Sequence, residues 1–301
     1  MIRMIKVSIL IVTYNQKDLL VECLESCLSQ TYDNFEIVVA DDGSTDGSHE
    51  MLIKYSNLYP GKFKFSLSKV NCGISKNSNA GLSLCSGNYV AIMGGDDLMH
   101  PDKIKKQVEF MEANPSCDVC YHDMDVFESS TNRSLYLYSD KNKSCSGDVR
   151  TVIRRGAINC ASATMYRANK IPLSGFREDL PVGSDWMLTV DVLSKGGRLV
   201  YIPEVLGRYR RHSSNVSGQD SPIRVQGTKD LIRTCSLCLE EYPQYSKEAV
   251  LRLSMVLRES RHVNNKTFYL PRMLASFMSG GDLKSLVGIL AFQLSRGRWT
   301  L

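Results

Sequence analysis

YVAIMGGDD, residues 89–97, is an apolar run that ends in two glycines and two adjacent carboxylates. Its first five residues suit a buried strand, and the stretch carries no charge before Asp96. Because adjacent carboxylates repel each other, Asp96 and Asp97 need a partner. The candidates are water at a surface turn, a nearby Lys or Arg, and a divalent metal ion, and the choice among them decides whether the chain is an enzyme.

Strands and helices alternate along the chain up to this stretch. Apolar runs predict strands at 7–12, 35–40, 63–67 and 89–93, and helical spacing predicts helices at 18–28, from about 45, and at 74–85. This alternation predicts an α/β fold with a mostly parallel, Rossmann-like sheet flanked by helices. In such sheets, ligands bind beyond the carboxyl ends of the strands.

Polar side chains follow three of these strands at their carboxyl ends. They are Thr13, Tyr14 and Asn15 after the first, Asp41 and Asp42 after the second, and Asp96 and Asp97 after the fourth. We therefore expect one pocket that holds an aromatic ring, hydroxyls, amides and four carboxylates. A carboxylate there can accept from a ribose hydroxyl or a base imide, and Tyr14 can stack on a nucleobase or pack in the core. No Gly-x-Gly-x-x-Gly or Walker loop follows the first strand, which disfavours dinucleotide and P-loop sites.

The pattern is less regular after Pro101. Helices are predicted at 101–114 and 184–194, strands at 118–127 and 198–202, and a polar loop at 129–146. A linker is expected at 219–222, and residues 223–295 have a helical pattern throughout.

The net charge is concentrated at the end of the chain. The sequence has 301 residues, of which 43% are hydrophobic and 23% charged, as is usual for a globular protein. Residues 229–301 contain 11 basic and 6 acidic residues, which accounts for the whole net charge of +5. Within 270–301, apolar clusters alternate with basic residues. We expect this segment either to lie on an anionic membrane or to pack as a helix on the catalytic domain or in a dimer.

The sequence predicts a cytoplasmic protein, either free or peripheral at the inner face of the cell membrane. Its N-terminal stretch lacks the long apolar core and cleavage site of a signal peptide, and no segment approaches the ~18 apolar residues of a membrane span. The ten cysteines are scattered, so we expect reduced thiols, and the Cys-x-x-Cys pairs at 117–120 and 235–238 are too far apart to favour a zinc site. No nucleic-acid partner is expected.

Taken together, these residues resemble those of a known family. Thr13–Asn15, Asp41–Asp46, Asn71–Gly81 and Gly95–Asp97 have the order and spacing found in family 2 glycosyltransferases, over about residues 5–215. The resemblance implies an inverting, non-processive enzyme of the GT-A fold. It also implies a GT-A domain at 1–218, with a nucleotide-sugar half at 1–100 and an acceptor half at 101–218, and a helical extension at 219–301.

The resemblance further implies a nucleotide-sugar site and a metal site. The nucleotide-sugar site would comprise Thr13, Tyr14, Asn15, Asp41, Asp42, Asn79 and Asp96, with Tyr14 and Asp42 on the base. Asp96, Asp97 and His212 would hold Mn²⁺ or Mg²⁺, which offsets the charge of a departing diphosphate. Arg208 and Arg210 either offset phosphate charge too or form a solvated basic run.

This chain departs from the family pattern at two positions. Gly94 stands where the family has the first Asp of its metal motif, which removes one carboxylate. Ser78 stands where the family often has an Arg, which removes a cation that would help to bind the diphosphate. Lys76 lies close in sequence and is a possible substitute for that cation.

Asp185 is the expected catalytic base, because it begins a predicted helix where the family carries an acidic pair. An inverting transfer needs a carboxylate that takes the proton of the acceptor hydroxyl. The alternatives are an early-helix acid favoured by the dipole, or a base at Asp179 or Glu178.

The expected function is transfer of a sugar from a nucleotide-sugar, with UDP-sugars favoured, to a saccharide or lipid-linked saccharide in surface polysaccharide biosynthesis. Two alternatives stay open: a sugar-phosphate nucleotidyltransferase, and a partner protein that binds sugar nucleotides without turnover.

Overall fold

The structure is a computed structural model that describes residues 5–156, 160–213, 215, 223–259, 269–280 and 283–294. The chain forms two compact units, one of Met1–Val149 with Ala157–Asn215 and one of Arg150–Gly156 with Val216–Leu301. The predicted domain boundary after residue 218 and the predicted linker at 219–222 lie outside the described residues. The predicted division into domains therefore stays a prediction.

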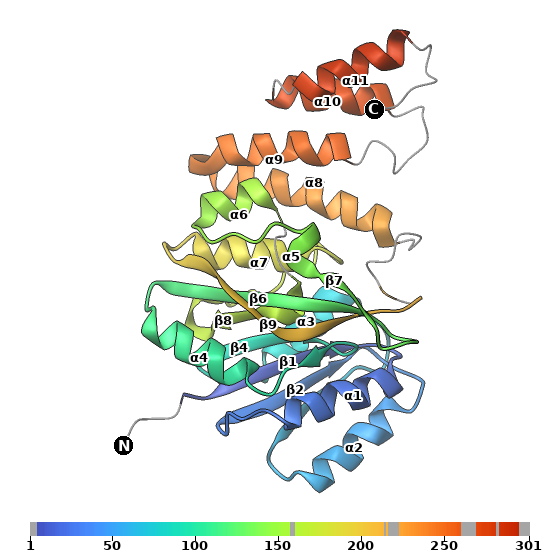
Figure 1. The fold of residues 1–301 in the computed structure, drawn as a ribbon, viewed down its shortest axis with the longest axis vertical. Coiled ribbons are helices and arrows are strands. Elements are labelled where there is room, and N and C mark those ends of the chain that lie inside the picture. The colour runs from blue at the N-terminus through green and yellow to red at the C-terminus, as the bar shows by residue number, and fades with distance from the viewer. Residues whose placement is uncertain are drawn as a thin grey trace. The chain divides into compact units, whose positions relative to one another are not determined.

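Nine strands of the described residues form one sheet in the first unit (Figure 1). They are β1 Val7–Thr13, β2 Phe35–Asp41, β3 Phe63–Leu67, β4 Tyr89–Gly94, β5 Leu98–Met99, β6 Cys117–Glu128, β7 Ser134–Leu137, β8 Thr164–Arg167 and β9 Arg198–Arg211. Their order is β3-β2-β1-β4-β8-β6-β9-β5, with β7 paired to β6. The first four strands are parallel to one another, as are β6 and β9, whereas β8 is antiparallel to both of its neighbours. The predicted α/β fold with a mostly parallel sheet is confirmed.

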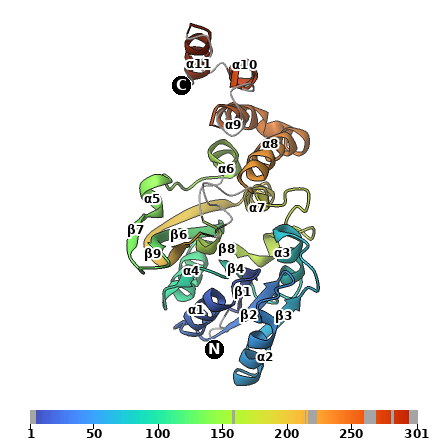
Figure 2. The same cartoon turned by 90° about the vertical axis from the view of Figure 1, so that its right-hand side faces the viewer.

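Helices cover both faces of this sheet. One face packs against α1 (Lys17–Leu28), α2 (Ser48–Leu58) and α4 (Lys103–Ala113) through one continuous apolar core. The other face packs against α3 (Ile74–Leu82), where a side chain at Gly81 would come within 2.5 Å of Leu10. Figure 2 shows α1 and α4 on one side of the strands and α3 on the other. The carboxyl ends of β1, β2 and β4 lie at the same end of the sheet and can position a site.

The later half of the first unit contains more sheet than its sequence predicts. The predicted loop at 129–146 contains β7 and α5 (Tyr138–Lys141), and β9 continues well beyond Ile202. Pro203 has no N–H for a ladder bond, which favours a strand end. Here the pairing with β6 passes from Ile202 to Val205 across a bulge, so the strand resumes after the proline. The unit also contains η1 (Ala161–Ala163), η2 (Ala168–Lys170) and α7 (Ser184–Leu193).

The second unit is helical within the described residues. Its elements are α6 Val149–Arg155, α8 Ile223–Glu241, η3 Pro243–Tyr245, α9 Ser246–Glu259, α10 Tyr269–Gly280 and α11 Leu283–Leu294. The helices α10 and α11 pack together through Tyr269, Met273 and Ile289. No helix among the described residues is long and apolar enough to cross a membrane.

Candidate functional site

Asp97 is the buried centre of the turn that follows β4, with only 2% of its surface exposed. Its Oδ2 accepts a hydrogen bond from the Ser162 hydroxyl at 2.5 Å, and its Oδ1 accepts one from the Arg210 backbone N–H at 2.9 Å. Burial, and then the neighbouring charge of Asp96, raise the pKa of Asp97 well above its usual range. Both oxygens are therefore engaged within the protein, which fixes the turn to β9 and η1.

Asp96 faces a different set of partners. Its Oδ2 lies 3.0 Å from His212 Nε2 and accepts a hydrogen bond from the Asn215 amide at 3.2 Å. The side-chain oxygen of Asn215 in turn accepts the His212 backbone N–H at 2.6 Å, which closes the turn after β9. Gly94 bears directly on this arrangement, because a Cβ at that position would stand 2.8 Å from Asp96 Oδ1. Because Gly94 has no side chain, the Asp96 carboxylate can occupy the space that a side chain at position 94 would fill.

Asp96 and His212 could together supply two ligands to a divalent cation that also binds a diphosphate. No group of three or more His, Cys, Asp or Glu side chains that could hold a metal occurs among the described residues. However, Mg²⁺ and similar ions are commonly held by one or two side chains while substrate phosphates and water complete the shell. One carboxylate oxygen and one imidazole nitrogen, 3.0 Å apart at the mouth of the sheet, suit that mode of binding.

The ends of β1 and β2 hold five of the residues predicted to bind the nucleotide-sugar, in adjacent positions. Thr13 pairs with Asp41 in the sheet, and its carbonyl accepts the Asp42 backbone N–H at 3.1 Å. Asn15 holds the facing loop through its side-chain oxygen, which accepts the Thr45 backbone N–H at 2.8 Å. Tyr14 keeps 43% of its surface exposed beside them. Its ring is therefore available for stacking rather than packed in the core.

The two acids after β2 have different surroundings. Asp41 is fully buried and accepts bonds from the Ser44 backbone N–H and hydroxyl, with His49 Nε2 at 2.8 Å. Asp42 accepts the backbone N–H groups of Cys72 and Gly73 at 2.8 and 2.9 Å. Asp41 therefore shapes the loop from inside, whereas Asp42 connects the end of β2 to the start of α3.

Asn79 does not join this group. Its side chain bonds both backbone groups of Phe176, accepting the N–H at 2.7 Å and donating to the carbonyl at 2.8 Å. Ser78, in the place of the family's Arg, is buried and donates to the Ile74 carbonyl at 2.7 Å. The structure therefore uses both residues to hold helix and loop in place.

Asp185 lies in the first turn of α7. A hydrogen bond connects this turn to α3, next to the residues predicted to bind the nucleotide-sugar. Ser184 is 2.8 Å from Ser75 on the first turn of α3, the helix whose entry Asp42 holds. Asp185 Oδ1 accepts the Trp186 backbone N–H at 2.8 Å, and burial raises the pKa of Asp185 above its usual value. A raised pKa makes the ionised carboxylate a stronger base. Trp186 itself is buried, which favours packing over sugar stacking.

Comparison with known proteins identifies the family. Residues 8–171 match the family described as Glycosyl transferase family 2. The chain belongs to this family. An uncharacterized Mycobacterium tuberculosis protein, Rv1520, is 30% identical over 215 residues, which are 69% of this chain and 60% of that protein.

Two solved glycosyltransferase structures share the fold. Residues 1–349 of S. aureus TarS, solved with UDP-GlcNAc, superpose with a TM-score of 0.67 at 17% identity, covering 96% of this chain and 92% of that one. The Pyrobaculum calidifontis mannosyltransferase PcManGT, solved with GDP-Man and Mn²⁺, gives a TM-score of 0.60 at 17% identity, covering 94% and 86%. At this identity the likeness shows the fold alone, and it confirms the expected GT-A fold of this family 2 glycosyltransferase.

Two residues of this glycosyltransferase site carried no sequence signal. Ser162 lies in a short turn, and Asn215 lies after the last strand, without a motif around either. Each reaches the carboxylate pair only because β8 pairs with β4 and β9 pairs with β5, the strand that directly follows the pair. The sequence offers Arg210 as a phosphate contact or part of a solvated basic run, but its side chain is buried, with only 3% of its surface exposed.

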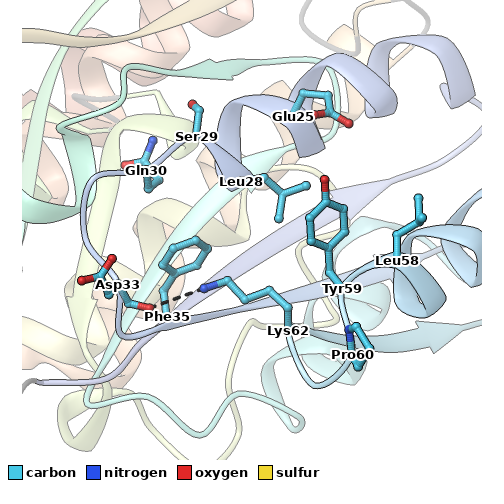
Figure 3. A pocket seen from close by; sticks show the side chains of 10 residues that line it. All are labelled: Glu25, Leu28, Ser29, Gln30, Asp33, Phe35, Leu58, Tyr59, Pro60 and Lys62. Carbon is cyan, nitrogen blue, oxygen red and sulfur yellow. Dashed lines mark hydrogen bonds between the residues drawn. The ribbon is translucent and has the colours of Figure 1, made fainter.

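A separate cleft lies near the amino-terminal ends of β2 and β3, whereas the candidate site lies at the carboxyl ends of the strands. Figure 3 shows its lining, with Lys62 Nζ 3.2 Å from the centre of the Phe35 ring. Its volume is about 690 Å³, and its residues come from the end of α1 and the loop after it, the start of β2, the end of α2 and the turn before β3. None of the predicted site residues lines it. This cleft is therefore distinct from the glycosyltransferase site.

Proposed function

We propose that this family 2 glycosyltransferase moves a sugar with inversion, one residue at a time, from a nucleotide-sugar to a hydroxyl of a saccharide or lipid-linked saccharide. A role in surface polysaccharide biosynthesis is part of the proposal. The observation that carries it is the arrangement of Asp96 with His212 after β4, Asp42 after β2, and Asp185 at the start of α7. The nucleotide-sugars bound in the TarS and PcManGT structures support the donor class, because both proteins share the fold.

The nucleoside would lie across the ends of β1 and β2. The exposed Tyr14 ring suits stacking on the base. Asp42 is buried there and accepts the Cys72 and Gly73 backbone N–H groups and the Cys72 thiol, so the imide N–H of uracil would share an oxygen of this carboxylate with the protein. We favour a UDP-sugar on this ground.

The diphosphate would lie at the end of β4. Asp96 and His212 would hold Mn²⁺ or Mg²⁺, which when bound neutralises charge on the departing nucleoside diphosphate. Asp97, expected from the sequence to be a further ligand, has both oxygens engaged with Ser162 and Arg210. We therefore propose that Asp97 positions Asp96 and does not bind the cation itself.

Asp185 would take the proton of the acceptor hydroxyl as the oxygen attacks the anomeric carbon. The bond from that carbon to the nucleoside diphosphate breaks on the opposite side, which inverts the configuration. Asp185 is partly buried, and this burial raises the pKa of its carboxyl, which makes the ionised carboxylate a stronger base. Asp179 is the weaker candidate, because its half-exposed side chain lies 3.6 Å from Arg177.

A donor panel tests the proposed reaction. We expect one UDP-sugar to release UDP in the presence of Mn²⁺, and release to stop when EDTA removes the ion. Release of UDP is measured with and without candidate acceptors. Nucleotide binding without release from any donor would favour a non-catalytic partner, and formation of a nucleotide-sugar from a nucleoside triphosphate would favour a nucleotidyltransferase.

We further propose that the α10–α11 hairpin lies on an anionic membrane. Six of its apolar residues are 42% to 86% exposed: Leu274, Met278, Leu283, Val287, Leu290 and Leu294. Those on α11 recur at helical spacing along one face, while Ser285, Gly288 and Ile289 are buried. The two described helices contain Arg272 and Lys284 and no acidic residue, which complements anionic lipid. Residues 295–301 of the predicted membrane segment lie outside the described residues.

Vesicle flotation tests this membrane contact. We expect Val287→Asp with Leu290→Asp to lower the fraction bound to phosphatidylserine vesicles by about fivefold or more, because two charges must enter the apolar interface. Ile53→Asp is the matched control, since Ile53 is 53% exposed on α2, outside the hairpin. Vesicles of phosphatidylcholine alone should bind less. If the double variant instead converts a dimer to a monomer in light scattering, the face covers a second copy and not a membrane.

A further inference from the structure

Arg210 is a buried cation directly behind the carboxylate pair. It lies near the end of β9, opposite Phe127 of β6, with its guanidinium carbon 4.8 Å from the centre of the Phe127 ring. Only 3% of its surface is exposed, so it cannot act as part of a solvated basic run. A buried cation costs free energy unless it is paired and hydrogen-bonded. The partners of Arg210 therefore indicate what it does.

Arg210 holds both carboxylate residues at the same time. Its backbone N–H donates to Asp97 Oδ1 at 2.9 Å, and its side-chain Nε donates to the Asp96 carbonyl at 2.7 Å. These two bonds fix the side chain of one acid and the backbone of the other. The Asp96 carboxylate is left to face His212 and Asn215.

The remaining donors of Arg210 tie this turn to two further segments. Its Nη2 donates to Glu22 on α1 at 2.6 Å, and its Nη1 donates to Ser129 at 3.3 Å. One guanidinium thus connects the turn after β4 with α1 and the end of β6. The planar fork of an Arg side chain can span such partners, whereas the single ammonium group of Lys cannot.

We propose that Arg210 is the positioning residue that sets the cation affinity of Asp96 and His212. This inference rests on the proposed function, because it concerns the same cation site. The guanidinium holds the backbone of Asp96 in register with His212, and its positive charge offsets part of the repulsion between the two adjacent carboxylates. Residues that orient metal ligands in this way typically contribute about 10- to 100-fold to metal affinity.

Arg208 provides a matched control on the same strand. It precedes Arg210 by two residues and also lies over the Phe127 ring, at 3.9 Å. Its side chain, however, donates to Asp125 at 2.9 Å and to Asn132 at 2.6 Å, and not to the carboxylate pair within the described residues. An Arg-to-Lys change at either position retains the charge and loses the fork. Only the change at Arg210 loosens Asp96.

The test compares Arg210→Lys and Arg208→Lys by calorimetric titration of UDP with and without Mn²⁺, and by thermal unfolding. We expect Arg210→Lys to raise the Mn²⁺ concentration at half-saturation by about tenfold or more, with metal-free UDP affinity unchanged. Arg208→Lys should leave both at the wild-type value. If Arg210→Lys fails to fold, Glu22→Gln replaces it, because Glu22 is half-exposed and the neutral amide weakens the charge-assisted bond to one end of the fork. The expected shift is then smaller and in the same direction.

Two results would overturn the inference. One is a wild-type Mn²⁺ requirement in Arg210→Lys, or in Glu22→Gln where the Lys variant does not fold. The other is an equal shift of Mn²⁺ dependence in the Arg208 and Arg210 variants. A failure of the proposed function is distinguishable, because then the wild-type protein itself would show no Mn²⁺-dependent UDP binding.

Discussion

We expect Asp185→Asn to lower kcat by about 10²- to 10⁴-fold, the range that a general base typically contributes. The amide has nearly the size of the carboxylate but cannot take the proton of the acceptor hydroxyl. Its oxygen can still accept the Trp186 backbone N–H, so α7 should keep its N-terminal turn. Release of UDP from the donor in the presence of acceptor measures the effect, and UDP affinity should stay at the wild-type value.

The control is Asp179→Asn, a change of the same chemistry at an acid six residues earlier in the chain. Asp179 lies near Arg177 and is about half exposed, so its loss should leave kcat nearly unchanged. If Asp185→Asn lowers UDP affinity and kcat by the same factor, Asp185 is a binding residue and not the base. If Asp179→Asn has the larger effect on kcat, the role of base belongs to Asp179.

The pH dependence gives this prediction a second measurement. A base acts only when it is ionised, and burial raises the pKa of Asp185 above its usual value of 3.8. The acidic limb of kcat/KM should therefore lie at higher pH than an ordinary Asp would give, with activity lost as the pH falls through it. The limb should vanish from the residual activity of Asp185→Asn. A limb that persists there belongs to another group.

The first half of the fold follows from the sequence because β1, β2 and β4 are largely apolar and buried. Val7–Thr13 and Phe35–Asp41 are buried on both faces by helices, and such strands carry an unmistakable apolar pattern. The later strands lack this signal. Ser134–Leu137 is mostly exposed at its edge of the sheet, and Thr164–Arg167 is only four residues long. Their positions depend on pairing with β6, which local patterns do not contain.

In the candidate site, too, some features could be predicted from the sequence and others could not. The acids after β2 and β4 could be predicted because parallel strands bring their carboxyl ends together, whatever the side chains. Contacts such as Asp96 with His212, which lie 116 residues apart, depend on how β9 crosses the sheet. The resemblance suggested His212, but it also suggested Asn79, whose amide holds the Phe176 backbone instead. A motif thus locates a residue on an element, whereas its contacts are set by the packing of this particular chain.

Gly94 shows how a departure from the family pattern can be read from the packing. The glycine lacks a carboxylate, but it also lacks the Cβ that would stand 2.8 Å from Asp96 Oδ1. Its backbone N–H donates to Ser162 at 2.9 Å, the same hydroxyl that binds Asp97. The turn is therefore built around the two remaining acids. Cation binding should consequently depend on Asp96 more heavily than in a site with three carboxylates.

Because cation binding should depend heavily on Asp96, removing the charge of this side chain should have a large effect. We expect Asp96→Asn to abolish the Mn²⁺-dependent part of UDP binding and to lower kcat/KM by about 10²- to 10³-fold, as loss of charge stabilisation at a leaving group typically does. The neutral amide is a poor ligand for a divalent ion, while its size and its place beside His212 are retained. Metal-free UDP affinity should not change. Asp102→Asn, an exposed acid near the start of α4, is the control that should leave all three measurements unchanged.

Asp97→Asn separates the two acids of the pair. Asp97 accepts from both Ser162 and the Arg210 backbone, and an amide can accept through only one of its atoms. We therefore expect Asp97→Asn to lower the unfolding temperature, with any loss of Mn²⁺ binding following from that disorder, whereas Asp96→Asn should unfold like the wild type. Loss of Mn²⁺ binding in Asp97→Asn at an unchanged unfolding temperature would make Asp97 a direct ligand, as the sequence alone predicts. Unchanged Mn²⁺-dependent UDP binding in Asp96→Asn would remove Asp96 from the cation site.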